Sequence, residues 1–220
     1  MFSTWANTET RRHGASNSLA WSARLRILAV TNALTVLLFA TVFTATLHFS
    51  TSARANEKSV VSFMNDLARS AIQANQTVNR SDLEKIIRDN VDVETIGDYS
   101  LGTYLGKLPK SEFEKYYDSV TNFMARYAAT QSRYYQVENV EFYRPKHHRD
   151  NTITLKSKIT MSSGTSYRVK WKIIQTDGQY KVLDASIFGF WLSPFQRRLF
   201  QSYVRENNHD VHALVAVLAQ

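Results

Sequence analysis

The residues of this chain that could do chemistry are few and lie far apart. His209 and His212, with Asp210 between them, would share one face of a helix, as two metal ligands can. Without a third clear ligand, ordinary surface residues are the better interpretation of this pair. His147 and His148 stand in a polar loop and are interpreted the same way.

The acidic residues give no catalytic pair either. Glu112 and Glu114 are placed to stabilise the start of a helix through its dipole. Asp184 lies in an apolar strand and could act as a general base, but no second catalytic group accompanies it. The sequence has no cysteine and no G-x-S-x-G, P-loop or G-x-G-x-x-G motif. We therefore predict a protein that is not an enzyme and needs no cofactor or metal.

The net charge of the chain limits which classes of partner are expected. The 220 residues carry a net charge of +8, which favours anionic surfaces. The Lys and Arg residues lack the dense clustering typical of nucleic-acid binding, so nucleic acid is not expected as a partner.

The first 55 residues resemble an export signal. Arg24 and Arg26 precede an apolar run, Ile27–Phe49, and small residues ending at Ala55 follow it. We predict cleavage after Ala55. The alternative is that Ile27–Phe49 is retained as a membrane anchor, because it is long enough to span a bilayer. Either way residues 56–220 form one domain outside the inner membrane, in the periplasm.

The first half of that domain is expected to be helical. Apolar residues recur at helical spacing over Glu57–Asn75, and Ser81 and Asp92 could cap two further helices. Ser111 and Glu114 form a capping box for the best-patterned helix. Its apolar stripe consists of Phe113, Tyr116, Tyr117, Val120, Phe123, Met124 and Tyr127. Such a stripe is typical of a core helix on a sheet, but its many tyrosines also fit a cavity that holds a lipid.

Four strand-like runs follow, at Tyr135–Arg144, Asn151–Met161, Tyr167–Ile173 and Tyr180–Phe188. They predict an α+β fold with a curved four-stranded antiparallel sheet. Together with the helices, this sheet would enclose an apolar cavity, as in cones of the nuclear-transport-factor type.

Register arithmetic places like charges opposite one another. If Met161 opposes Thr165, Lys158 opposes Arg168 and Lys156 opposes Lys170, which is unfavourable. The face is then either solvated, with relief from Glu138 or Glu141, or a docking surface for an acidic partner or an anionic membrane. The Asp177–Gly178 turn would put Asp184 opposite Trp171, on the apolar face, as a hydrogen-bonded structural residue.

The strand-to-helix corner after Asp184 needs apolar cover. Phe190, Trp191 and Leu192 are consecutive, and Ser193, Pro194 and Gln196 form a helix-start signal. Behind it, an apolar stripe is expected at Phe195, Leu199 and Tyr203. Either the core or an apolar ligand must cover the exposed corner.

This corner also carries a family resemblance. The run Tyr180–Leu192, followed by an Arg-x-x-Phe-x-x-x-Val pattern ending at Val204, resembles the C-terminal signature of the MlaC family. Similarity continues upstream in Asn90–Ile96, Leu101–Tyr104 and Phe113–Tyr127, and spans roughly Glu57 to Leu218. The family comprises periplasmic phospholipid shuttles, also called toluene-tolerance or auxiliary transport proteins.

The resemblance implies a carrier that moves phospholipid between the inner and outer membranes and serves outer-membrane lipid asymmetry. Its implied partners are an inner-membrane ABC transporter complex with a ring-forming lipid-binding subunit, and an outer-membrane lipoprotein–porin complex. The cargo would be a phospholipid or, as an alternative, a hopanoid-like lipid. By resemblance, Tyr127 and Phe190 fall where similar proteins line the lipid tails.

Pattern and resemblance together define two sets of site residues. The expected lipid-binding residues are Tyr116, Val120, Phe123, Met124, Tyr127, Val169, Trp171, Ile173, Phe190, Trp191 and Leu192. The expected docking residues are Lys156, Lys158, Arg168 and Lys170. Two other hypotheses stay open, a single-span membrane-anchored assembly scaffold of a secretion-type complex and an enzyme of the same cone-like fold.

Overall fold

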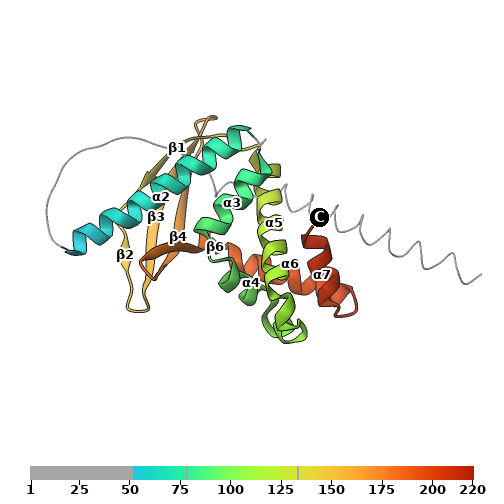
Figure 1. Ribbon diagram of the computed structural model, residues 1–220. Helices are drawn as coiled ribbons and strands as arrows, with labels where there is room; N and C mark the ends of the chain where they lie inside the picture. The colour runs from blue at the N-terminus through green and yellow to red at the C-terminus, as the bar shows by residue number, and fades with distance from the viewer. Residues whose placement is uncertain (1–51, 78, 133) are drawn as a thin grey trace, which may run out of the picture. The chain divides into compact units, whose positions relative to one another are not determined.

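An open antiparallel sheet forms one side of the fold in the computed structural model, which describes residues 52–77, 79–132 and 134–220 (Figure 1). Its strand order is β1-β3-β4-β5-β6, with β2 paired to β3. The strands are β1 (Val137–Phe142), β2 (Lys146–His147), β3 (Thr152–Met161), β4 (Ser166–Thr176), β5 (Gln179–Ile187) and β6 (Phe190–Trp191). The four long strands match the four predicted runs. The first run corresponds to β1. Strand β2 lies beyond it, after Pro145, so the prediction of a polar loop at His147 is wrong.

The β3–β4 pair has the predicted register. Lys156 is paired with Lys170, and Lys158 with Arg168. Strand residues alternate in burial, so Leu155 and Trp171 face the core while these four basic side chains are exposed.

The predicted pairing of β4 with β5 is correct near the turn but wrong from Asp184 onward. Ile173 pairs with Val182 as the turn dictates, but the register then shifts by one residue. Asp184 therefore pairs with Lys172 and not with Trp171, whose partner is Ala185. This β-bulge at Leu183 moves the Asp184 carboxylate off the core face, because a one-residue shift reverses the side to which each following side chain points.

Six α-helices lie in the described part of the chain, together with two short 3-10 helices. They are α2 (Ser52–Thr77), α3 (Arg80–Asn90), α4 (Val93–Leu101), η1 (Gly102–Lys107), η2 (Lys110–Glu112), α5 (Phe113–Ser132), α6 (Leu192–Glu206) and α7 (Val211–Leu218). Helices α2, α3, α4 and α6 contact the sheet, and α5 packs mainly against α3, α4 and α7 (Figure 1). Within the described ranges, no helix combines the length and hydropathy needed to cross a bilayer.

Some of the predicted helix-capping residues are confirmed and others are not. Asp92 caps α4 as predicted, accepting a hydrogen bond from the Thr95 N–H at 3.0 Å. Ser81 does not cap α3, because Asn79 takes that place and accepts from the Ser81 N–H. Ser111 lies inside η2, which runs directly into α5. The interpretation of residues 1–51, including the Ile27–Phe49 segment, lies outside the described residues, and Ala55 falls in the first turn of α2.

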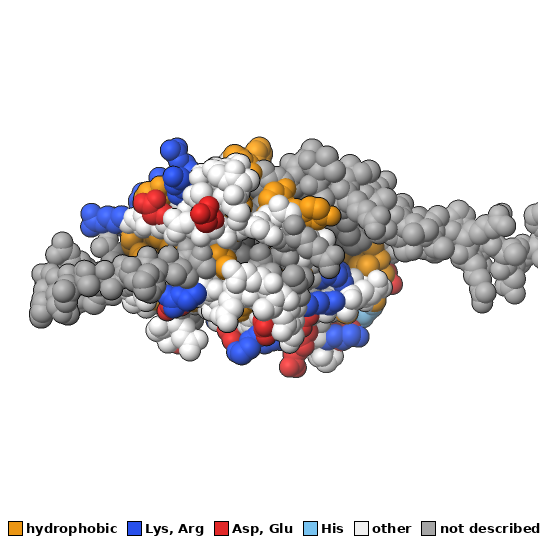
Figure 2. Space-filling model, turned by 90° about the horizontal axis from the view of Figure 1, so that it is seen from above, with side chains coloured by type: hydrophobic (Ala, Val, Ile, Leu, Met, Phe, Trp, Pro, Cys, Tyr) orange, Lys and Arg blue, Asp and Glu red, His pale blue; other side chains and the backbone are white. Residues whose placement is uncertain are grey.

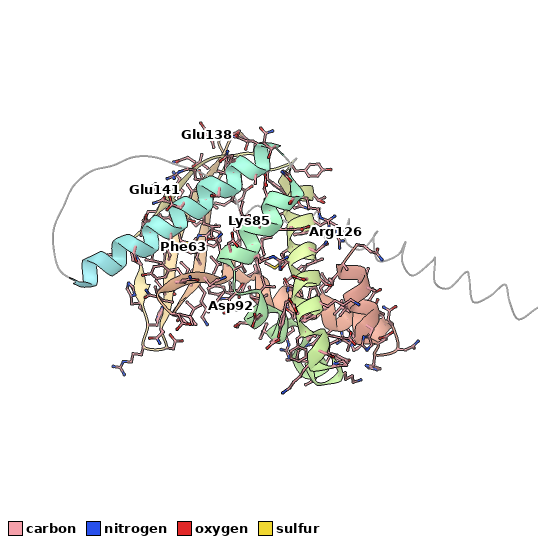
Figure 3. The ribbon with its side chains drawn as sticks, in the orientation of Figure 1. Phe63, Lys85, Asp92, Arg126, Glu138 and Glu141 are labelled. Carbon is pink, nitrogen blue, oxygen red and sulfur yellow. The ribbon has the colours of Figure 1, made fainter. Side chains whose placement is uncertain are left out.

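One apolar cluster joins the sheet to the helices. The long helix α2 contributes Val60, Met64 and Leu67 to it. The ring of Phe63 from the same helix lies 5.8 Å from that of Tyr180 on β5 (Figure 3). On α6 the most deeply buried residues are Phe200 and Val204, whereas the predicted stripe of Phe195, Leu199 and Tyr203 is half-buried. Further cluster members come from α3, α4, α5 and α7, so the helices share one interior with the core face of the sheet.

Candidate functional site

Most of the expected lipid-binding residues lie in this shared interior. Tyr116, Val120 and Phe123 on α5 are buried members of the cluster. Val169, Trp171 and Ile173 on β4 are buried members too. Met124 and Leu192 are half-buried and pack against the cluster, and the half-buried Tyr127 ring stacks on that of Phe123. The structure thus brings the α5 residues and the β4 residues to one continuous apolar interior.

The other two expected lipid-binding residues lie outside the apolar cluster. Phe190 is 66% exposed and Trp191 is half-buried, and neither belongs to the cluster. Both lie in β6, which pairs with the end of β5 directly before α6 begins. This arrangement fits residues at a mouth better than residues in an interior.

The polar atoms of the buried aromatic residues already have protein partners. The Tyr116 hydroxyl donates to the Gly97 carbonyl at 2.8 Å, and the Trp171 indole donates to the Ser157 hydroxyl at 3.0 Å. Burial raises the pKa of Tyr116 well above its usual range, so this phenol is neutral. The surface of this interior therefore consists of hydrocarbon groups. The polar atoms of its buried aromatic residues already have hydrogen-bond partners within the protein.

Among the described residues, the buried core holds no Asp, Glu, His, Lys or Arg side chain. Its polar members are Ser, Thr and Gln, together with buried tyrosine and tryptophan rings that belong to the apolar cluster. An apolar molecule in this interior would therefore meet no charged side chain.

Asp184 has a structural position at the corner between β5 and α6. Its Oδ1 accepts hydrogen bonds from the backbone N–H of Ser193 at 3.0 Å and of Ala185 at 2.8 Å. The predicted cap at Ser193 is wrong, because α6 begins at Leu192 with no capping side chain at Trp191. Asp184, adjacent in space, satisfies the helix N–H instead. Gln196 donates to the Ser100 hydroxyl rather than closing a capping box.

Substitution of Asp184 tests this role. Burial raises the pKa of the Asp184 carboxyl, and the N–H bonds from Ser193 and Ala185 oppose the rise. A folded-state pKa above the ordinary value means that this group stabilises the fold most at acidic pH, and that the contribution is lost as pH rises through the folded pKa. Asp184→Asn keeps an acceptor, so we expect it to match or exceed the wild-type melting temperature at neutral pH. Asp184→Ala should cost about 1 kcal/mol.

Thermal unfolding of the three proteins at acidic and neutral pH measures both effects. If the alanine and asparagine variants unfold together at every pH, the cap is not provided by Asp184.

The turn between β5 and β6 holds a phenylalanine in an unfavourable backbone conformation. Phe188 and Gly189 have φ of 52° and 86°, as in a two-residue type I′ hairpin turn. Glycine adopts this conformation readily, and asparagine does so more easily than phenylalanine. Phe188 is nevertheless 59% exposed, with its ring packed edge-on against Tyr167. Sequence analysis missed this feature, although the Phe-Gly pair at the hairpin was a usable signal.

The four expected docking residues surround a hollow on the other side of the sheet. This hollow of about 950 Å³ is lined by Lys156, Lys158, Arg168 and Lys170. Tyr143, Tyr167 and Phe188 also line it. Lys170 Nζ lies 5.8 Å from the ring centroid of Trp191. Lys170 and Trp191 are therefore neighbours across β4, β5 and β6.

The histidines have separate partners. His209 Nδ1 is 2.9 Å from the Tyr104 hydroxyl, and His212 Nδ1 is 3.2 Å from a Glu112 carboxylate oxygen. No group of three potential ligands occurs within the part of the chain that the structure describes. The acidic residue Glu112 is thus engaged with a histidine, which the sequence did not indicate.

Comparisons with known proteins agree with this geometry. The family model described as MlaC protein matches residues 56–220. A solved phospholipid-binding protein from Ralstonia solanacearum, in complex with a phospholipid, has a similar fold with a TM-score of 0.59 and 14% sequence identity. The match covers 74% of this chain and 93% of that one. No curated protein matches the sequence.

Proposed function

Because the chain belongs to the MlaC family, we propose that it is a periplasmic carrier that moves phospholipid between the inner and outer membranes. The observation that carries the proposal is the continuous apolar interior shared by α5 and β4, with exposed apolar residues at one edge. Phospholipid tails would lie among Tyr116, Val120, Phe123, Met124, Tyr127, Val169, Trp171 and Ile173, below a mouth formed by Phe190, Trp191 and Leu192. The headgroup would stay outside.

Tails that occupy this interior must separate side chains that touch one another. Phe123, for example, contacts Phe200 edge-on with ring centroids 5.4 Å apart. The rings of Phe123 and Tyr127 also stack. Movement of helix α5 relative to the sheet would provide the space, since α5 packs mainly against helices α3, α4 and α7.

The energetics of loading depend on the reference state. Each buried methylene gains about 0.8 kcal/mol relative to water, so two full tails would exceed any realistic affinity if water were the donor. The donor is a membrane, and the protein interior need only approximate bilayer hydrocarbon. Loading is then nearly neutral in free energy and reversible, which a shuttle requires. Few headgroup contacts are needed, in keeping with the absence of a polar binding motif.

Membership of the family supports proposals for the compartment and the partners. We place the carrier in the periplasm, with a leader that ends after Ala55 or stays as an anchor. Its expected partners are an inner-membrane ABC transporter complex with a ring-forming lipid-binding subunit, and an outer-membrane lipoprotein–porin complex. The cargo is a phospholipid or a hopanoid-like lipid.

Native mass spectrometry of the protein recovered from the periplasm tests the proposal. We expect one lipid per protein chain, identified after extraction. N-terminal sequencing of the same sample adds an independent result, because a start at Asn56 is expected for a free shuttle and an intact Met1 for an anchored scaffold. Lipid-free protein with an intact N-terminus would contradict the carrier.

A further inference from the structure

The outward face of β3 and β4 carries basic side chains, and neither strand contains an acidic residue. Lys156, Lys158, Arg168 and Lys170 form two directly opposed like-charged pairs. Within the described residues none of the four makes an ion pair, although Glu141 of β1 lies opposite Lys158 in the register (Figure 3). Like charges directly opposite each other destabilise a sheet. The arrangement therefore needs a compensating role.

A view of the molecule from above offers a comparison. On that face basic, acidic and apolar side chains are interspersed, as on an ordinary solvated surface (Figure 2). The hollow on β3 and β4 instead combines four cations with Tyr143, Tyr167 and Phe188, and no Asp or Glu lines it.

An exposed aromatic turn lies at one end of the hollow, where Phe188 lines it. Phe188 and Phe190 stand on either side of Gly189 and are 59% and 66% exposed. Phe188 is held at a φ of 52°, a conformation that is unfavourable for phenylalanine. Asparagine in the same place would adopt it more easily. A strained and exposed aromatic side chain is a sign of function at the turn.

We propose that this basic face, with the Phe188–Phe190 turn, docks on the surface of a bilayer that contains anionic phospholipids. Lysine and arginine would contact the phosphate groups while the two phenylalanines enter the boundary between headgroups and acyl chains. The mouth residues Trp191 and Leu192 follow the turn directly, so docking would bring the mouth to the bilayer. The purpose of docking rests on the proposed carrier function, but docking itself can be measured without it.

An acidic protein surface is the alternative occupant. Opposed cations could pair with carboxylates, but such pairing gives no role to Phe188 and Phe190, which are 59% and 66% exposed. The pairing of basic residues with exposed aromatic residues is typical of proteins that lie at membrane interfaces. The bilayer is therefore the occupant that accounts for both features.

Vesicle flotation of the full chain, recovered in the form that the cell produces, tests the proposal. Vesicles of phosphatidylcholine alone are compared with vesicles that also contain phosphatidylglycerol. Because residues 27–49 are apolar, the ratio of anionic to neutral binding is the measured quantity. Arg168→Gln with Lys170→Gln should lower that ratio about 25-fold, since each basic residue near an anionic surface contributes about a fivefold factor. Added salt should weaken the wild-type ratio.

A matched control removes the same charge elsewhere. Lys110→Gln with Lys115→Gln, both on exposed helical positions, should leave the ratio within about twofold of wild type. Phe190→Ser changes no charge and should lower binding to both vesicle types about tenfold. Equal effects of the two double variants, or no preference of wild type for anionic vesicles, would overturn the proposal and leave the face to an acidic protein.

A second readout separates docking from carriage. Lipid copurified with the Arg168→Gln and Lys170→Gln double variant should equal that of wild type, because these residues point away from the apolar interior. Charge-dependent flotation without any copurified lipid would refute the carrier and keep the docking face. Copurified lipid without charge-dependent flotation would refute the docking face and keep the carrier.

Discussion

A Met124→Glu variant is expected to fold but to lose nearly all of its bound lipid. Met124 is half-buried on α5, where it packs against the apolar cluster among the proposed tail-binding residues. In the lipid-free protein a glutamate there can reach water, whereas tails packed against it would strip the carboxylate of solvent. That cost is at least about 3 kcal/mol, which lowers lipid occupancy roughly a hundredfold. Native mass spectrometry of protein recovered from cells measures the occupancy directly.

Ile86→Glu is the matched control for this experiment. Ile86 is also half-buried on a helix against the same cluster, but it is outside the proposed tail-binding set. The two variants should lose similar amounts of folding stability, and only Met124→Glu should lose its cargo. If both variants keep their lipid, the tails do not lie along α5.

The second large effect is expected for Phe200→Ala, which should lower the free energy of unfolding by about 3–5 kcal/mol. The Phe200 ring is fully buried and meets Phe123 edge-on, so it connects α6 to α5. Domains of this kind are stable by about 5–15 kcal/mol in total, and the loss is therefore a large share. Denaturant unfolding monitored by circular dichroism measures it.

Phe190→Ala provides the comparison. Its ring is two-thirds exposed, so its loss should change the free energy of unfolding by less than about 0.5 kcal/mol. Similar losses for the two alanine variants would mean that Phe190 is buried in solution, contrary to its exposure in the structure.

The sequence pattern predicted those parts of the fold in which the interacting residues are close in the sequence. Alternation along β3 and β4, together with a short turn, defined the like-charged pairs Lys156–Lys170 and Lys158–Arg168. Asp92 was recognisable as a cap because its partner Thr95 is three residues away. In each case the interacting groups are close in the sequence, or a turn of known length joins them.

The incorrect predictions concern interactions between distant residues. A bulge at Leu183 has no reliable signal in a single sequence, and counting from Asp177–Gly178 therefore misplaced Asp184. Ser193 had the residue type of a cap, yet the carboxylate nine positions earlier occupies the helix N-terminus. The core face of α6 is centred on Phe200 rather than Leu199, because the angle at which a helix leaves a corner decides which stripe is buried.

The bulge gives strand β5 one residue more than its partner β4 requires. A deletion of Leu183 would join Val182 to Asp184, which would still lie opposite Lys172, and Ala185 would still lie opposite Trp171. The ladder would then be regular, and the carboxylate, the helix start and the aromatic turn would keep their places. At this position the strand can therefore lose a residue without a change in which side chains face the core.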